Sequence, residues 1–150
     1  MIAPSLAGNF QAMNMQGASD RRIRTLLVDD HATFLDELAH LLEEEREMDV
    51  VGRAASGEDA VEQATALRPD LVLMDLAMPG MGGLEATRRL KAEPDAPRVI
   101  MLSLHEHPMY RTAALDAGAN GFIPKSKLGT TLLPMIHSLF PAAIEDAVAS

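Results

Sequence analysis

Short, wholly apolar segments alternate with longer segments of helical periodicity along most of this chain of 150 residues. Every side chain is apolar in residues 71–74 and again in residues 99–102. A strand tolerates such a run when both faces of its sheet are buried, as in a parallel sheet that helices cover on both sides. Apolar positions every three or four residues predict helices between the runs. The alternation therefore predicts an α/β fold with a doubly wound parallel sheet.

Five strand and helix pairs are expected, and together they form one domain over residues 23–140. The strands begin near residues 23, 50, 71, 99 and 121. Residues 1–22 are predicted to be a flexible arm, because the first 19 residues carry no charge and several are polar. Four apolar residues at helical spacing within residues 2–13 leave a docking helix as the alternative. Residues 141–150 are expected to be a short tail.

The charge and cysteine counts argue against several functional classes. The chain has 22 acidic and 13 basic residues, whereas surfaces that bind nucleic acids or anionic membranes gather Lys and Arg. Without cysteine there is no disulfide framework and no thiolate ligand or nucleophile. No apolar run approaches the roughly 20 residues that cross a bilayer, and the N-terminus lacks the basic start of a secretory signal. We therefore expect a cytoplasmic protein.

Polar residues follow four of the predicted strands, at the sheet edge where such folds bind ligands. They are Asp29, Asp30, Asp75, Ser103 and Lys125. Taken one at a time, each has an ordinary structural interpretation as a helix cap, a turn residue or a solvated side chain. Three carboxylates gathered at one edge, however, would raise one another's pKa unless a cation lies among them.

The types of these residues predict a phosphoryl-transfer site that uses Mg²⁺. All the candidate ligands are oxygen donors, which favours Mg²⁺ over zinc. The cation keeps open positions for water and a phosphoryl oxygen, and a carboxylate can act as the nucleophile that forms an acyl phosphate. A lysine and a serine can hold the other phosphoryl oxygens.

Three segments give this pattern a family resemblance. Residues 27–31 (LVDDH), 69–79 (PDLVLMDLAMP) and 118–125 (GANGFIPK) together resemble a bacterial response-regulator receiver domain of two-component systems. The resemblance runs from about residue 24 to 125 and is closest to the receivers of LuxR/NarL-type regulators. It implies a flavodoxin-like (βα)5 sandwich with the strand order 2-1-3-4-5.

The resemblance also implies roles for individual residues. Asp75 would accept a phosphoryl group from a sensor histidine kinase or a histidine phosphotransfer protein. Asp29, Asp30, Asp75 and the backbone carbonyl of Ala77 would hold Mg²⁺. Lys125 would pair with the phosphoryl group.

The resemblance further implies a conformational switch. Ser103 would hydrogen-bond the phosphoryl group, and Phe122 occupies the position of the family's aromatic switch. His105 would modulate the lifetime of the phosphoryl group, with a solvated loop histidine as the alternative. The switch would act on the face made by the fourth helix, fifth strand and fifth helix, where a downstream protein or a second copy binds.

Two positions depart from the family pattern. Ser126 follows Lys125 where receivers commonly have a proline after a cis bond, so a cis bond is not assumed here. Pro134 lies where the fifth helix should already run, which predicts a late start near Thr130 or Thr131, or a kink. We therefore expect the partner surface on this helix to be unusual.

We interpret the chain as a stand-alone receiver, a phosphorylation-controlled binding module rather than an enzyme, that does not itself bind DNA or membranes. The alternative is the receiver part of a LuxR-type DNA-binding regulator. A third possibility is a Mg²⁺-dependent phosphohydrolase with an aspartyl-phosphate intermediate. The haloacid-dehalogenase type would need an acid where Ala77 stands, which argues against it.

Overall fold

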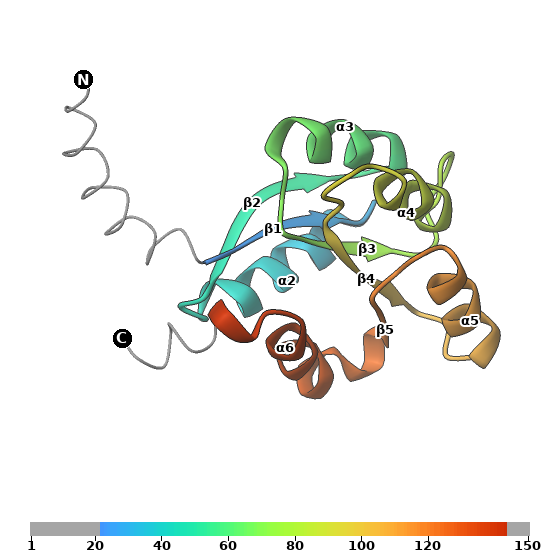
Figure 1. Ribbon diagram of the computed structural model, residues 1–150. Helices are drawn as coiled ribbons and strands as arrows, with labels where there is room; N and C mark the ends of the chain where they lie inside the picture. The colour runs from blue at the N-terminus through green and yellow to red at the C-terminus, as the bar shows by residue number, and fades with distance from the viewer. Residues whose placement is uncertain (1–21, 144–150) are drawn as a thin grey trace, which may run out of the picture.

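The computed structural model describes residues 22–143, which form a parallel sheet with helices on both sides (Figure 1). The strand order is β2-β1-β3-β4-β5, which confirms the doubly wound fold. The strands are β1 (Ile23–Val28), β2 (Met48–Ala54), β3 (Leu71–Asp75), β4 (Arg98–Ser103) and β5 (Gly121–Pro124). The predicted arm, its alternative docking helix and most of the predicted tail lie outside the described residues.

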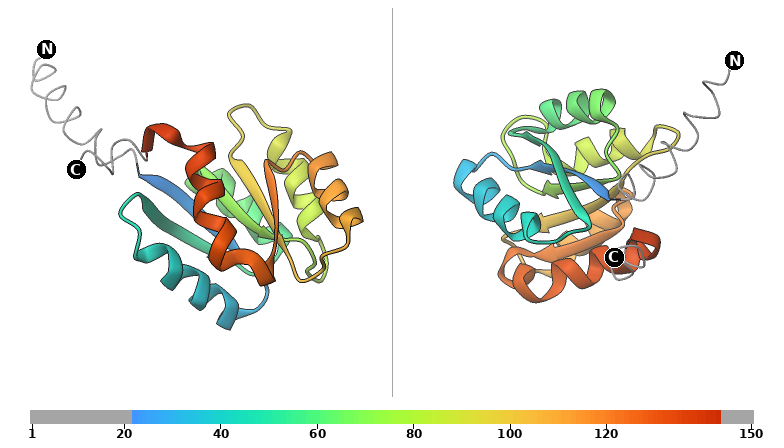
Figure 2. Two further views of the ribbon diagram at one scale, coloured as in Figure 1. Left: turned by 90° about the horizontal axis from the view of Figure 1, so that it is seen from below. Right: turned by 90° about the vertical axis from the view of Figure 1, so that its left-hand side faces the viewer.

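Within residues 22–143, five α-helices cover the sheet in two layers (Figures 1 and 2). One layer holds α2 (Ala32–Glu43) and α6 (Leu128–Leu139), and the other holds α3 (Gly57–Leu67), α4 (Gly83–Lys91) and α5 (Pro108–Asp116). A short 3-10 helix, η1 (Lys125–Lys127), joins β5 to α6. None of the helices in the described range is long and apolar enough to cross a membrane.

Two apolar cores, one on each face of the sheet, explain the uninterrupted apolar strands. Along β1, Leu27 packs in the core under α2 and α6, whereas Leu26 packs in the core under the other three helices. Along β3, Leu73 packs in the core under α2 and α6, and Met74 packs in the other core. All four side chains are fully buried. Successive residues of a strand point to opposite faces, so burial of both faces requires an apolar residue at every position.

The last helix does not start late, and the prediction of a delayed start is wrong. Helix α6 begins at Leu128, with Lys127 at the N-cap position and Pro134 inside the helix. Proline lacks the N–H that would bond the carbonyl of Thr130. Both Pro134 and Thr130 are exposed, so water can satisfy that carbonyl and the helix continues. No cis peptide bond occurs in residues 22–143, so Lys125–Ser126 is trans.

The domain extends beyond residue 140. Ala143 is buried, at 7% exposure, and packs in the same core as Leu132 and Ile136 of α6. The helical spacing of apolar residues ends at Phe140, one residue after α6, and the predicted boundary therefore lies there. The start of the predicted tail therefore contributes to the core.

Candidate functional site

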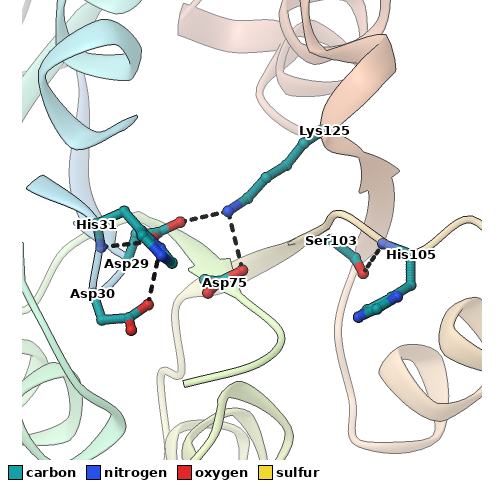
Figure 3. A network of polar contacts seen from close by, with 7 residues as sticks. All are labelled: Asp29, Asp30, His31, Asp75, Ser103, His105 and Lys125. Carbon is teal, nitrogen blue, oxygen red and sulfur yellow. Dashed lines mark hydrogen bonds and ion pairs between the residues drawn. The ribbon is translucent and has the colours of Figure 1, made fainter. Parts of the chain in front are cut away.

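Three strand ends bring together charged side chains from distant parts of the chain. Asp29 follows β1, Asp75 ends β3 and Lys125 follows β5. The Lys125 ammonium lies 2.6 Å from Oδ2 of Asp29 and 3.2 Å from Oδ1 of Asp75, so it bridges the two carboxylates (Figure 3). Strand β5 is two positions from β3 in the sheet, and the extended lysine side chain spans that distance. The predicted convergence of these residues is thus present.

Burial changes the electrostatics of this cluster. Asp29 is fully buried and the Lys125 side chain is 9% exposed. Burial, and then the negative charge of Asp29, raise the pKa of Asp75 from 3.8 to about 6, while Lys125 opposes the shift. The surroundings of Asp75 therefore disfavour its ionised form. Additional positive charge beside the carboxylate would stabilise that form.

His31 lies against the pair of aspartates that begins the site. Its Nδ1 is 3.0 Å from Oδ1 of Asp29 and 3.2 Å from Oδ1 of Asp30. Its backbone N–H also donates to Oδ1 of Asp29 at 2.9 Å. The hydrogen bond to Asp29 and then the charges of Asp30 and Asp29 raise the pKa of His31. Asp30 is therefore joined to the cluster through this imidazole.

Ser103 and His105 lie at the same edge but do not contact the carboxylates of the described site. Ser103 is 1% exposed, and its hydroxyl accepts a hydrogen bond from the backbone N–H of His105 at 2.9 Å (Figure 3). The imidazole of His105 stacks on Tyr110 of α5, with the ring centroids 4.8 Å apart.

The remaining predicted residues are Phe122 and Ala77. Phe122 on β5 is 2% exposed, and its ring lies 5.5 Å from the guanidinium of Arg111 on α5. The aromatic ring is therefore turned inward. Ala77 is exposed in the loop two residues after Asp75.

The helix-capping roles considered for the strand-end residues are wrong. His31, not Asp29 or Asp30, occupies the N-cap position of α2, and it makes no side-chain cap. His107, not Ser103, caps α5, and its Nδ1 accepts from the backbone N–H of Met109 at 3.1 Å. Asp29, Asp30 and Ser103 therefore do not serve as helix caps, and a role in the site remains as their interpretation.

The donors at this edge fit a hard divalent cation. One ligand atom each from Asp29, Asp30 and His31 lies within 4.8 Å of the others. Carboxylate oxygens are the ligands that Mg²⁺ prefers, and two or three of them leave positions for water and phosphate. The Nδ1 of His31 contacts both aspartates, so it must move aside or join the ligands when a cation binds.

Sequence reasoning assigned no role to two residues of the site. His31 follows the aspartate pair directly, and this adjacency was a usable signal. Phe34 lies four residues after Asp30, in the first turn of α2, and its ring centroid is 4.1 Å from the Lys125 ammonium. Because Phe34 is apolar, the sequence pattern predicted only that it lies on the buried face of a helix.

Comparison with known proteins gives the family. The model of the response regulator receiver domain matches residues 25–137. The response regulator GacA of Pseudomonas viridiflava is 41% identical over 118 residues, which cover 78% of this chain and 53% of GacA. The chain spans about half the length of the curated relatives it matches.

Solved structures agree. The receiver domain of the putative response regulator NarL from Mycobacterium tuberculosis has a TM-score of 0.72 and 30% identity, over 82% of this chain and 97% of that domain. A chain in the CheX–CheY–BeF3–Mg²⁺ complex from Borrelia burgdorferi has a TM-score of 0.70 and 26% identity, over 79% and 89%. With the strand order and the clustered aspartates, these matches show that the chain belongs to the response-regulator receiver domains, the signalling domains of two-component systems.

Proposed function

We propose that Asp75 accepts a phosphoryl group from the phosphohistidine of a sensor histidine kinase or a phosphotransfer protein. Receiver domains in general bind Mg²⁺ and interact with histidine kinases and downstream partners. The observation that carries the proposal is the position of Lys125, whose ammonium lies between the buried carboxylates of Asp29 and Asp75. A buried lysine beside a carboxylate of raised pKa is suited to a reaction in which that carboxylate gains negative charge.

The transfer is a displacement at phosphorus. An oxygen of Asp75 forms the new O–P bond, the P–N bond of phosphohistidine breaks, and its electron pair returns to the imidazole nitrogen. A pKa near 6 makes the Asp75 carboxylate more basic than an ordinary aspartate, yet leaves it ionised at neutral pH. Lys125 is 3.2 Å from this carboxylate and can pair with an oxygen of the incoming group.

Asp29, Asp30, Asp75 and the carbonyl of Ala77 would hold Mg²⁺, which when bound neutralises charge on the phosphoryl oxygens. The side chain of Ala77 supplies no acid beside Asp75. We therefore favour a signalling domain that retains its phosphoryl group over an enzyme that turns over phosphate esters.

Phosphorylation would act on partners through Ser103 and Phe122. The Ser103 hydroxyl now accepts a bond from His105, and turning it toward the phosphoryl group would release that loop. Large apolar side chains are exposed in the loop after β4 and on α5: Leu104, Met109 and Leu115. Exposed apolar side chains are suited to contact with a protein partner or a second copy where they gather into one patch. We place that partner surface on α5, β5 and α6, with His105 as a modulator of the phosphoryl lifetime.

Intact mass after incubation with Mg²⁺ and a small-molecule phosphodonor tests the acceptor chemistry. We expect a gain of one phosphoryl group that is lost in Asp75→Asn and in a Mg²⁺-free control. Asp70→Asn is a matched control, because Asp70 lies before β3, and its Oδ2 accepts from the backbone N–H of Arg24 at 2.9 Å. A gain that persists in Asp75→Asn would overturn the assignment.

A further inference from the structure

The Lys125 ammonium has a third neighbour besides the two carboxylates. Its Nζ lies over the ring of Phe34, 4.1 Å from the ring centroid. The face of an aromatic ring carries partial negative charge and attracts an ammonium within about 6 Å of its centroid. The attraction is stronger when the cation is shielded from water, and the Lys125 side chain is only 9% exposed.

Phe34 is itself held in place by the fold. It is the third residue of α2, is half-buried and packs against the core that contains Leu35 and Leu38. Its ring is therefore fixed by a helix, whereas the long lysine side chain enters from the 3-10 helix η1 after β5. The contact joins two elements that are far apart in the sequence, at the point where the candidate phosphoacceptor lies.

We propose that Phe34 is a positioning residue that holds the Lys125 ammonium at Asp75 for phosphoryl transfer. This proposal rests on the function proposed above. A divalent cation beside Asp29 would compete for that carboxylate and repel the ammonium. The ring of Phe34 is uncharged and does not bind the divalent cation, so the contact between the ring and the ammonium remains when the cation is present. It also adds no further negative charge to compete with the incoming phosphoryl oxygens for the lysine.

The test uses variants that distinguish the electrostatic effect of the aromatic ring from the packing of an apolar side chain. Phe34→Leu keeps an apolar side chain and removes the ring, while Phe34→Tyr keeps the ring. Fluorinated phenylalanines incorporated at position 34 weaken the negative ring face in steps at nearly constant shape. Phe140→Leu is the matched control, because Phe140 is also half-buried and packs against the same core, at the end of α6.

The first measurement is spectroscopic and independent of phosphorylation. In the wild-type protein and in Phe34→Tyr, the Hε protons of Lys125 should show an upfield NMR shift from the ring current. The shift should be lost in Phe34→Leu and kept in Phe140→Leu. Absence of the shift in the folded wild-type protein would overturn the contact.

The second measurement is the rate of phosphorylation by acetyl phosphate with saturating Mg²⁺. We expect about a 3- to 10-fold lower rate in Phe34→Leu, a graded decrease along the fluorinated series, and rates within about twofold of wild type in Phe34→Tyr and Phe140→Leu. A wild-type protein that is phosphorylated while Phe34→Leu keeps its full rate would refute the positioning role alone. A wild-type protein that gains no phosphoryl group either from acetyl phosphate or from a phosphorylated histidine kinase would instead refute the proposed function.

Discussion

The Lys125 ammonium donates to Oδ2 of Asp29 over 2.6 Å, although the two residues are 96 positions apart in the chain. Asp29 follows β1 and Lys125 follows β5, so the contact requires that β1, β3, β4 and β5 are paired in the sheet. Neither side chain has much access to water. The pair therefore links the stability of the fold directly to the electrostatics of the candidate site.

Removing Lys125 should be strongly destabilising. Lys125→Met leaves Asp29 buried without its cationic partner, and breaking a buried pair in this way costs about 3–5 kcal/mol. Urea unfolding at neutral pH without Mg²⁺ measures the effect. The double variant Lys125→Met with Asp29→Asn should lose clearly less than the sum of the two single variants. Additive losses would mean that the two residues do not stabilise each other.

Asp75 should make the Mg²⁺-free protein less stable as the pH rises. Its pKa is 3.8 in the unfolded chain and about 6 in the folded protein, so its stabilising effect is present below about pH 4 and is lost as the pH rises through 6. Asp75→Asn should remove this dependence and raise the free energy of unfolding at pH 7 by about 1–2 kcal/mol. Unfolding curves with EDTA between pH 4 and 8 measure it. Parallel profiles for both proteins would contradict the assignment.

The imidazole of His31 should hinder Mg²⁺ binding. Its Nδ1 lies 3.0 Å and 3.2 Å from oxygens of Asp29 and Asp30, which are the proposed ligands. His31→Ala should therefore raise Mg²⁺ affinity by about 3- to 10-fold in isothermal titration calorimetry. His40→Ala, on the same helix α2 but bonded to the carbonyl of Asp36, is the control and should bind as wild type does. Weaker binding in His31→Ala would identify the ring as a ligand.

The close approach of α4 to the end of β3 should make Gly83 sensitive to substitution. A Cβ at this position would collide with the backbone carbonyl of Asp75 and lie 2.7 Å from Cε of Met101. Gly83→Ala should cost about 1–3 kcal/mol in thermal or urea unfolding. Gly129→Ala is the counterpart, because nothing lies within 4 Å of a Cβ there in α6, and it should stabilise by about 0.5–1 kcal/mol. Equal effects at both positions would contradict the packing argument.

Pro134 should be a site where the domain can be stabilised. Pro134→Ala restores an N–H that can bond the carbonyl of Thr130, and the exposed position has room for the change. We expect a gain of about 1–3 kcal/mol in the free energy of unfolding, with more helical signal in circular dichroism. Unchanged or lower stability would show that the ring makes a compensating contact.

Local pattern was sufficient for the architecture of this domain. Apolar runs such as residues 71–74 require burial on both faces, and the helical spacing between runs leaves a doubly wound sheet as the solution. Because parallel strands end at one edge, the same pattern also placed Asp29, Asp75 and Lys125 near one another before any contact was known. The sequence by itself thus determined the layers, the strands and the edge that carries the site.

Predictions from the sequence pattern were wrong where the local structure depended on the tertiary surroundings of a residue. The late start predicted from Pro134 was wrong because helix propensity does not reveal that Pro134 and Thr130 are both exposed to water. Ala143 was assigned to the tail because an isolated alanine carries no periodic signal, yet it is buried in the core. Capping by Asp30 and Ser103 was considered because these types favour caps, but histidines hold those positions instead.

The chemistry within the site was decided by tertiary structure alone. Whether Lys125 pairs with Asp29, with Asp75 or with both depends on the reach of one side chain across the edge of the folded sheet. The raised pKa of Asp75 depends on burial and on a charge 46 positions away, and the ring of Phe34 under the lysine depends on the packing of α2. These contacts and this pKa depend on side-chain positions to within about an ångström and on local solvation. Both are set only when the chain is packed.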